Sequence, residues 1–191
     1  MKINIEDDFI AGKEVEDLVK RFDIKLIIET GTYHARTALM FSNLAQVWSV
    51  EINPENFAVA KKNVDDSQTV NKVSLFQDNS VDFLNSFLKP GKIQGRNVLF
   101  FLDAHWYDYC PLLDELKVIA KSKMKPVIVI HDFMVPGTDF GYDSYDGKPF
   151  SFELIQSSLE QIYGIKYGYY YNTVAEGARR GLIYIYPEDI E

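Results

Sequence analysis

The sequence has one cysteine, Cys110, among its 191 residues, so no disulfide can form within the chain. This sparse use of cysteine is typical of proteins in a reducing compartment, and we expect a cytoplasmic protein. Long apolar runs are also absent, since no window approaches the roughly 20 residues that a membrane span requires. The charged N-terminal segment lacks the apolar stretch of a signal peptide. A membrane partner is therefore not expected.

Positive charge is scarce as well. The chain has 20 lysines and arginines against 28 aspartates and glutamates, which gives a net charge of −8. This balance argues against a nucleic-acid backbone as the partner, and the short basic pair Arg179-Arg180 does not alter it. Hydrophobic residues at 47% and aromatic residues at 14% exclude a disordered chain. The length suits a single domain over residues 1–191, without repeats or linkers.

Short apolar runs alternate with amphipathic segments along the chain, which predicts an α/β fold. The predicted strands are Leu26–Ile28, Val47–Val50, Val73–Phe76, Asn97–Leu102, Val127–Ile130, Ile165–Tyr171 and Gly181–Tyr186. Helices between the first strands predict a Rossmann-like, mostly parallel sheet between two helical layers. A helix-free connection of about ten residues precedes the last strand, which favours an antiparallel pairing there.

Two further segments have predicted roles outside this alternation. Apolar residues at three- and four-residue spacing within residues 1–24 predict an N-terminal helix that covers one edge of the domain. Residues 133–149 form a long segment rich in glycine and aspartate, with Gly137, Gly141 and Gly147. A loop of this length in a compact domain is often functional, so we expect a lid or substrate loop.

Polar residues follow the predicted strands where each strand ends: Glu29, Glu51, Asp78, Asp103 and the pair His131-Asp132. Ligands of open α/β sheets bind outside the carboxyl ends of the strands, so these side chains predict a binding site. The alternative is that strand-end acids cap the helices that follow them, which is a common role. Capping by all of them together is the less expected outcome.

The segment Lys25–Ser42 reads as a buried strand, a polar turn and a helix. Its turn resembles the first motif of the class I S-adenosylmethionine-dependent methyltransferases, an acid with glycines at the second, fourth and sixth positions after it. Here Glu29 and Gly31 match, whereas Tyr33 and Ala35 replace the later glycines. The Glu-x-Gly-Thr-Tyr turn is similar to that of small-molecule O-methyltransferases of the macrocin and cephalosporin-biosynthesis type. A dinucleotide fingerprint would require further glycines, so a Rossmann oxidoreductase is disfavoured.

The resemblance implies S-adenosylmethionine as the cofactor. Glu51 follows Gly31 by 20 residues, a spacing at which an acid binds both ribose hydroxyls. By resemblance, Asp78 lies beside the adenine amino group, although it could equally be the N-cap of the next helix. Glu29 and the backbone after it would face the methionine end. The cofactor-binding residues implied in this way are Glu29, Gly31, Thr32, Tyr33, Glu51, Asp78, Asn79, Ser80 and Asp103.

The block FFLDAHWYDYCPLLDEL, followed by VIVIHDF, resembles the metal-dependent O-methyltransferases, which include catechol O-methyltransferase. This resemblance implies that Asp103, His131 and Asp132 bind a divalent cation. Oxygen ligands suit Mg²⁺, whereas the imidazole of His131 favours Mn²⁺ or a similar ion. The alternative is that His131 is a buried, hydrogen-bonded residue with no metal. His105 is the predicted general base beside Asp103, because imidazole titrates near neutral pH.

The sequence therefore predicts an S-adenosylmethionine-dependent O-methyltransferase of a small hydroxylated molecule, assisted by a divalent cation. A second hypothesis is a binding module without catalysis, in which Tyr33 fills part of the cofactor's place. A third is a metal-dependent hydrolase or hydroxylase-like enzyme that uses no S-adenosylmethionine. The sequence is compatible with a homo-oligomer and leaves the identity of the substrate open.

Overall fold

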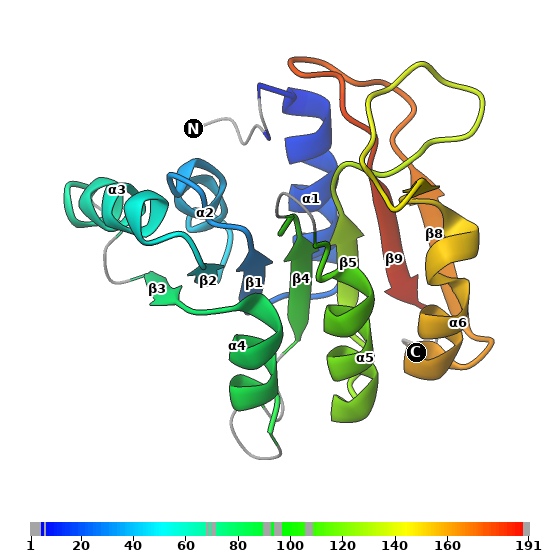
Figure 1. Cartoon of the computed structure of the whole chain (residues 1–191), viewed down its shortest axis with the longest axis horizontal. Coiled ribbons are helices and arrows are strands. Elements are labelled where there is room, and N and C mark those ends of the chain that lie inside the picture. The colour runs from blue at the N-terminus through cyan, green and yellow to red at the C-terminus, as the bar shows by residue number, and fades with distance from the viewer. Residues whose placement is uncertain are drawn as a thin grey trace.

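The computed structural model describes residues 5, 7–67, 69, 72–89, 93, 97–105 and 109–188. A sheet of seven strands crosses the molecule in the order β3-β2-β1-β4-β5-β9-β8 (Figure 1). Its strands are β1 Leu26–Thr30, β2 Gln46–Glu51, β3 Val73–Gln77, β4 Val98–Leu102, β5 Val127–Ile130, β8 Tyr167–Tyr171 and β9 Ile183–Pro187. Strand β9 runs antiparallel to β5 and β8, while the pairs among β1 to β5 are parallel. This topology confirms the predicted sheet.

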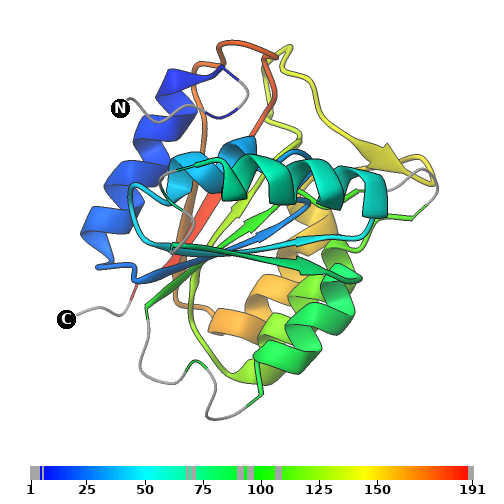
Figure 2. The same cartoon turned by 90° about the vertical axis from the view of Figure 1, so that its left-hand side faces the viewer.

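Helices cover both faces of the sheet, as Figure 2 shows from the side. The helices are α1 Phe9–Arg21, α2 Arg36–Phe41, α3 Pro54–Asp65, α4 Ser80–Phe87, α5 Leu112–Ser122 and α6 Phe152–Tyr163. Successive side chains of a strand point to opposite faces. Ile27 of β1 accordingly packs in the core that contains α1, whereas Ile28 packs in the core that contains α5 and α6. Each face of the sheet thus has its own apolar core.

Helix α1 lies within the segment 1–24, and its side chains Ala11, Val15 and Leu18 are buried in one of these cores. Asp8 caps this helix, because its carboxylate accepts hydrogen bonds from the backbone of Ile10 and Ala11. Among the residues described, no helix is both long enough and apolar enough to cross a bilayer.

The segment 133–149 is more regular than the sequence analysis predicted, since it contains the short hairpin β6 Ser144–Tyr145 and β7 Lys148–Pro149. Asp146 and Gly147 form the turn with φ of 51° and 70°. Positive φ at both central residues is the condition for a type I′ turn, and Asp-Gly is its preferred sequence. The dipeptide was therefore the signal that could have predicted the hairpin.

Candidate active site

The turn after β1 lies at the carboxyl edge of the sheet and has an unusual backbone. Gly31, Tyr33 and Ala35 have φ of 88°, 48° and 64°. These are the three glycine positions of the methyltransferase motif, so the chain keeps the left-handed conformation with only one glycine. A Cβ at Gly31 would lie 2.5 Å from the carbonyl oxygen of Asp103. Glycine is required there, because it allows the turn to pack directly on the backbone at the end of β4.

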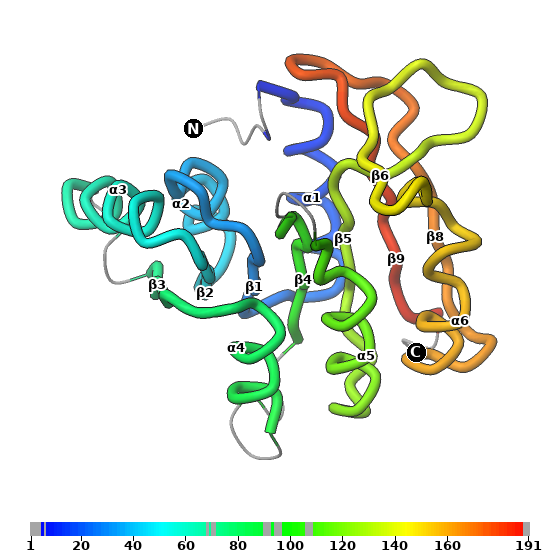
Figure 3. The backbone as a smooth tube through the Cα atoms, in the orientation of Figure 1, coloured from blue at the N-terminus to red at the C-terminus, as the bar shows by residue number. Residues whose placement is uncertain are grey.

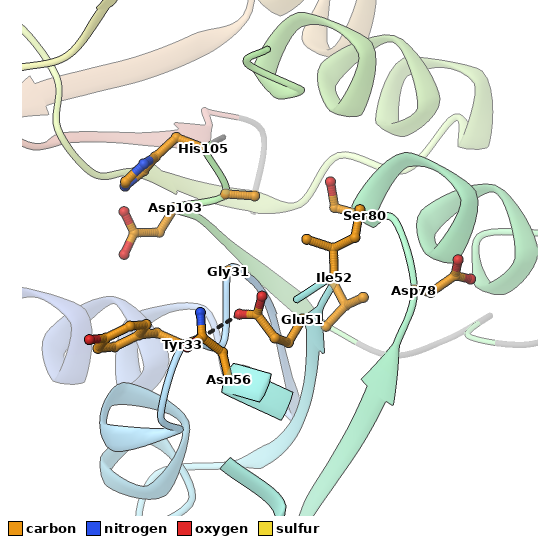
Figure 4. A pocket seen from close by; sticks show the side chains of 11 residues that line it. Gly31, Tyr33, Glu51, Ile52, Asn56, Asp78, Ser80, Asp103 and His105 are labelled. Atoms are coloured by element: carbon orange, nitrogen blue, oxygen red, sulfur yellow. Dashed lines mark hydrogen bonds between the residues drawn. The ribbon is translucent and has the colours of Figure 1, made fainter. Parts of the chain in front are cut away.

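Glu51 ends β2 and holds this turn in place. Its Oε2 accepts a hydrogen bond of 2.7 Å from the backbone N–H of Tyr33 (Figure 4). Its Oε1 accepts one of 2.8 Å from the backbone N–H of Asn53. Only 7% of the residue is exposed. Each carboxylate oxygen can accept more than one hydrogen bond, so capacity for a ligand hydroxyl remains.

A cavity of about 310 Å³ opens beside Glu51 at the carboxyl ends of β1, β2 and β4. Figure 4 shows Asp103 and His105 on one side of it and Asp78 on the other. The predicted residues that line it are Gly31, Tyr33, Glu51, Asp78, Ser80, Asp103 and His105. The prediction missed Val50, Ile52, Asn56 and Ala104, which also line the cavity. Val50, Ile52 and Ala104 lie at or next to strand ends, whereas Asn56 lies in the first turn of α3, and none belongs to a chemical motif that could have indicated it.

Three predicted cofactor residues, Glu29, Thr32 and Asn79, are not among the described residues of the cavity wall. Glu29 and Thr32 are buried behind it, where the hydroxyl of Ser49 donates to Glu29 and lies 2.6 Å from the hydroxyl of Thr32. Burial raises the pKa of Glu29 to about 8, so its carboxyl is neutral at pH 7. Glu29 thus bonds to Ser49 behind the turn, and its predicted contact with the cofactor stays a prediction.

Asn79 caps a helix and does not line the cavity. Its side-chain oxygen accepts hydrogen bonds from the N–H groups of Val81 and Asp82. It is the N-cap of α4, so the alternative interpretation of Asp78 as that cap is wrong. Asn53 caps α3 in the same way. Within the described part of the chain, the N-cap positions of the helices after β1 to β4 are not taken by the strand-end acids.

The predicted metal ligands Asp103, His131 and Asp132 do lie together. His131 Nδ1 is 3.0 Å from Asp103 Oδ1 and 3.1 Å from Asp132 Oδ1. Burial lowers the pKa of His131, but the two carboxylates outweigh it and hold this pKa well above its ordinary value. For Asp132, burial raises the pKa, but His131 and Arg180 outweigh it and hold the pKa well below the usual range. The positive charges of His131 and Arg180 therefore compensate the carboxylates of this cluster.

Arg180 is the main site residue that the sequence analysis missed. Its Nε donates to Asp132, and its Nη2 donates to Asp143 of the segment 133–149. The imidazole of His105 lies against the same two acids, with Nε2 3.5 Å from Asp132 and Nδ1 3.9 Å from Asp143. His105 thus stands between the cavity and an ion-paired cluster. Arg180 is 48 residues from Asp132 and 37 from Asp143 in the sequence, so no local pattern indicates these ion pairs.

The sequence model of the O-methyltransferase family matches residues 4–138. The chain belongs to the O-methyltransferase family. Two curated relatives are the catechol O-methyltransferases of Mus musculus and Sus scrofa. The mouse protein is 27% identical over 135 residues, which are 66% of this chain and 49% of the mouse protein. The pig protein is 27% identical over 134 residues, 66% of this chain and 69% of its own length. The chain thus spans about half the length of the mouse relative.

Solved structures of methyltransferases share the fold of this chain. TomG of Streptomyces achromogenes, in complex with SAM, superposes with a TM-score of 0.68 at 14% identity, over 93% of this chain and 79% of TomG. The O-methyltransferase of Bacillus cereus, in complex with SAH, gives a TM-score of 0.64 at 16% identity, over 93% and 80%. The family and the fold are therefore as the sequence resemblance implied.

Membership of this family raises the question of whether a divalent ion fits the acid cluster. The side chains of Asp103, His131 and Asp132 each offer one ligand atom, all within 4.8 Å of one another. Asp132, however, already pairs with Arg180, and His131 bonds with Asp103. An ion on Asp132 would have to displace a guanidinium. The predicted ligands do lie together, but their pairing with one another and with Arg180 does not fit an added divalent ion.

Proposed function

We propose that this O-methyltransferase transfers a methyl group from S-adenosylmethionine to a hydroxyl of a small molecule in the cytoplasm. The observation that carries the proposal is the cavity at the carboxyl ends of β1, β2 and β4, walled by the left-handed Gly31 turn and the carboxylate of Glu51. Ligands of open α/β sheets bind at this place. The net charge of −8 supports a small-molecule partner over a nucleic acid.

The arrangement of polar groups supports one orientation of the cofactor. Glu51 lies in the middle of the wall, where its oxygens can accept the ribose hydroxyls. Asp78 and Ser80, at one side in Figure 4, would contact the adenine. Gly31 and Asp103, at the other side, would contact the methionine part. In this orientation the reacting methyl group faces His105.

S-adenosylmethionine supplies, when bound, a methyl group on a positively charged sulfur. His105 would accept the proton of the substrate hydroxyl while the oxygen–methyl bond forms and the sulfur–methyl bond breaks. Asp132 and Asp143 lie 3.5 and 3.9 Å from the two ring nitrogens of His105, so they can orient the imidazole. Most of the rate enhancement would come from positioning the hydroxyl in line with the methyl group.

The two other hypotheses have less support. In the binding-module hypothesis Tyr33 fills part of the cofactor's place. Tyr33 is 62% exposed and its ring stacks on that of His34, with 3.8 Å between ring centroids, which argues against that role. The hydrolase or hydroxylase-like hypothesis required chemistry without S-adenosylmethionine, which membership of the O-methyltransferase family does not favour.

Isothermal titration of the protein with S-adenosylmethionine and S-adenosylhomocysteine tests the proposal, with adenosine as a control ligand. Transfer of a labelled methyl group to a panel of phenols, catechols and sugar alcohols then tests the substrate class. Replacement of His105 by Ala should lower turnover by about 10²–10⁴-fold and leave S-adenosylhomocysteine binding nearly unchanged. Failure of both sulfur ligands to bind at millimolar concentration would contradict the proposed function.

A further inference from the structure

The guanidinium of Arg180 lies between two carboxylates that come from different parts of the chain. Asp132 is the second residue after β5, whereas Asp143 belongs to the segment 133–149. Both accept hydrogen bonds from Arg180, through Nε and Nη2 respectively. The side chain of Arg180 is only 26% exposed and that of Asp132 is 7% exposed. This is a partly buried, two-sided ion pair beside His105, and two of its three members, Asp143 and Arg180, lie beyond the residues that the family model matches.

The structure holds Arg180 firmly in this place. Gly141 packs on its side chain, since a Cβ at Gly141 would lie 3.0 Å from Nη1 of Arg180. The backbone around it is bonded as well, with Gly181 N–H donating to Gly141 at 2.9 Å and Asn172 donating to the Arg180 carbonyl at 3.1 Å. The loop before β9 and the segment 133–149 lie side by side at the upper end of the sheet in Figure 3. The position of this arginine is therefore built into the fold.

Removal of Arg180 would leave a set of ligands for a metal ion. His105, Asp132 and Asp143 each offer one ligand atom, and these atoms lie within 4.8 Å of one another. Two carboxylates at such a distance require a nearby positive charge, which a divalent ion can supply. An arginine supplies it permanently, because its guanidinium stays protonated and can bond to two acids at once.

We propose that Arg180 takes the place of a divalent cation on Asp132 and Asp143, so that this O-methyltransferase binds no divalent ion at its catalytic cavity. Arg180 is then a positioning residue, since it fixes the two acids that flank His105. The inference rests on the proposed methyl transfer for its catalytic meaning. Its main test, however, is a titration that measures metal binding and does not depend on methyl transfer.

The experiment is a titration of the full chain with Mn²⁺. Binding is measured by the loss of the EPR signal of free Mn²⁺ and by calorimetry. The variants are Arg180→Ala and Arg180→Gln, of which the second keeps more of the packing if the first fails to fold. Arg179→Ala is the matched control, because Arg179 pairs with Asp139 at 2.8 Å where both side chains are exposed, at 57% and 79%. Circular dichroism verifies the fold of each variant.

The Arg180 variants should bind Mn²⁺ at least tenfold more tightly than the unmodified protein and the Arg179 variant. Addition of Asp143→Asn to the Arg180 variant should remove the gain. Methyl transfer by the unmodified protein should be the same with and without EDTA. Equal Mn²⁺ binding by unmodified protein and Arg180 variants, whether tight or absent, would overturn the inference. Failure of S-adenosylhomocysteine to bind would instead contradict the proposed function.

Discussion

Tyr33 and Ala35 have backbone conformations that glycine adopts at no steric cost, with φ of 48° and 64°. For a residue with a Cβ this conformation costs roughly 1–2 kcal/mol. The strain occurs where a loop surrounds a binding cavity, a common location for such residues. The turn therefore keeps its shape through its surroundings, notably the bond from Tyr33 N–H to Glu51.

Replacement of Ala35 by Gly tests this strain. Relief of about 1–2 kcal/mol should outweigh the loss of a buried methyl group, which is worth about 0.8 kcal/mol. The control is Ala38→Gly in α2, which is equally buried but helical. It loses the methyl group and about 1 kcal/mol of helix propensity. In urea unfolding, the Ala35→Gly variant should be at least as stable as the unmodified protein. Its free energy of unfolding should exceed that of Ala38→Gly by about 2–3 kcal/mol. A variant at position 35 as unstable as that at position 38 would contradict the strain.

Glu51 carries the prediction for cofactor affinity. Its replacement by Ala should weaken binding of S-adenosylhomocysteine by about 1.5–3 kcal/mol, the range for hydrogen bonds to a charged group. An acid at the end of a strand would contribute little to folding if it were exposed, but Glu51 is buried and accepts hydrogen bonds from two backbone N–H groups. The variant should therefore also unfold at a lower urea concentration.

Glu55→Ala is the control for Glu51, because it removes an exposed acid from the first turn of α3. Calorimetric titration should show almost the same affinity for this variant as for the unmodified protein. Unchanged affinity in Glu51→Ala would exclude the ribose contact.

At the scale of the elements, the segment 133–149 stays a predicted lid. Its base is fixed, since Met134 N–H donates to Phe150 at 2.7 Å and Asp143 N–H donates to Asp132 at 2.9 Å. Residues 136–139 are exposed, and nothing lies within 4 Å of a Cβ placed at Gly137. Movement is therefore expected at this tip and in the hairpin, with Arg180 as the anchor.

Hydrogen exchange measured by mass spectrometry tests the lid. Exchange in residues 136–149 should slow when cofactor product and acceptor are both bound, because closure over the substrate excludes water. Helix α6 is the internal control, since its buried face should exchange equally in both states. A segment that is protected to the same degree with and without ligands is not a lid.

The sequence predicted most elements because their signals are local. Strand β5, Val127–Ile130, is a continuous apolar run, and its predicted bounds match those observed. The cap of α3 by Asn53 also follows from neighbouring residues. Arg180 could not be predicted in this way, because its role depends on acids that only the folded sheet brings to it. The burial of Glu29 depends likewise on packing from other elements.

At the scale of the whole molecule, stability depends on pH through Glu29 and Glu115, which are buried and have raised pKa values. Burial raises the pKa of Glu29 to about 8 and that of Glu115, on α5, to about 7, from an ordinary value of 4.5. At a pH between 4.5 and these raised pKa values, the two carboxyl groups keep their protons in the folded protein and lose them in the unfolded chain. The free energy of unfolding should therefore fall as pH rises from about 4.5 to about 8, because the unfolded chain then binds fewer protons.

Replacement of Glu115 by Gln should remove its share of this fall, which is at most about 3 kcal/mol because one pKa unit corresponds to about 1.4 kcal/mol. Urea unfolding at pH 5 and pH 8 measures it: the variant should lose less stability between the two values than the unmodified protein. Glu55→Gln, which alters an exposed carboxyl, should follow the unmodified protein. Parallel curves for Glu115→Gln and the unmodified protein would show that Glu115 is ionised in the folded state.

The antiparallel direction of β9 has a consequence for how this site can change. In a parallel strand only the residues after its end reach the ligand edge, but a reversed strand brings the residues before its start there. Arg180 precedes β9 by three positions and reaches the edge for this reason. The positive charge beside the cavity, that of Arg180, thus comes from a surface loop. Loops tolerate substitutions and insertions that strands do not. A few changes there could exchange a fixed cation for a metal ion and leave every strand of the sheet intact.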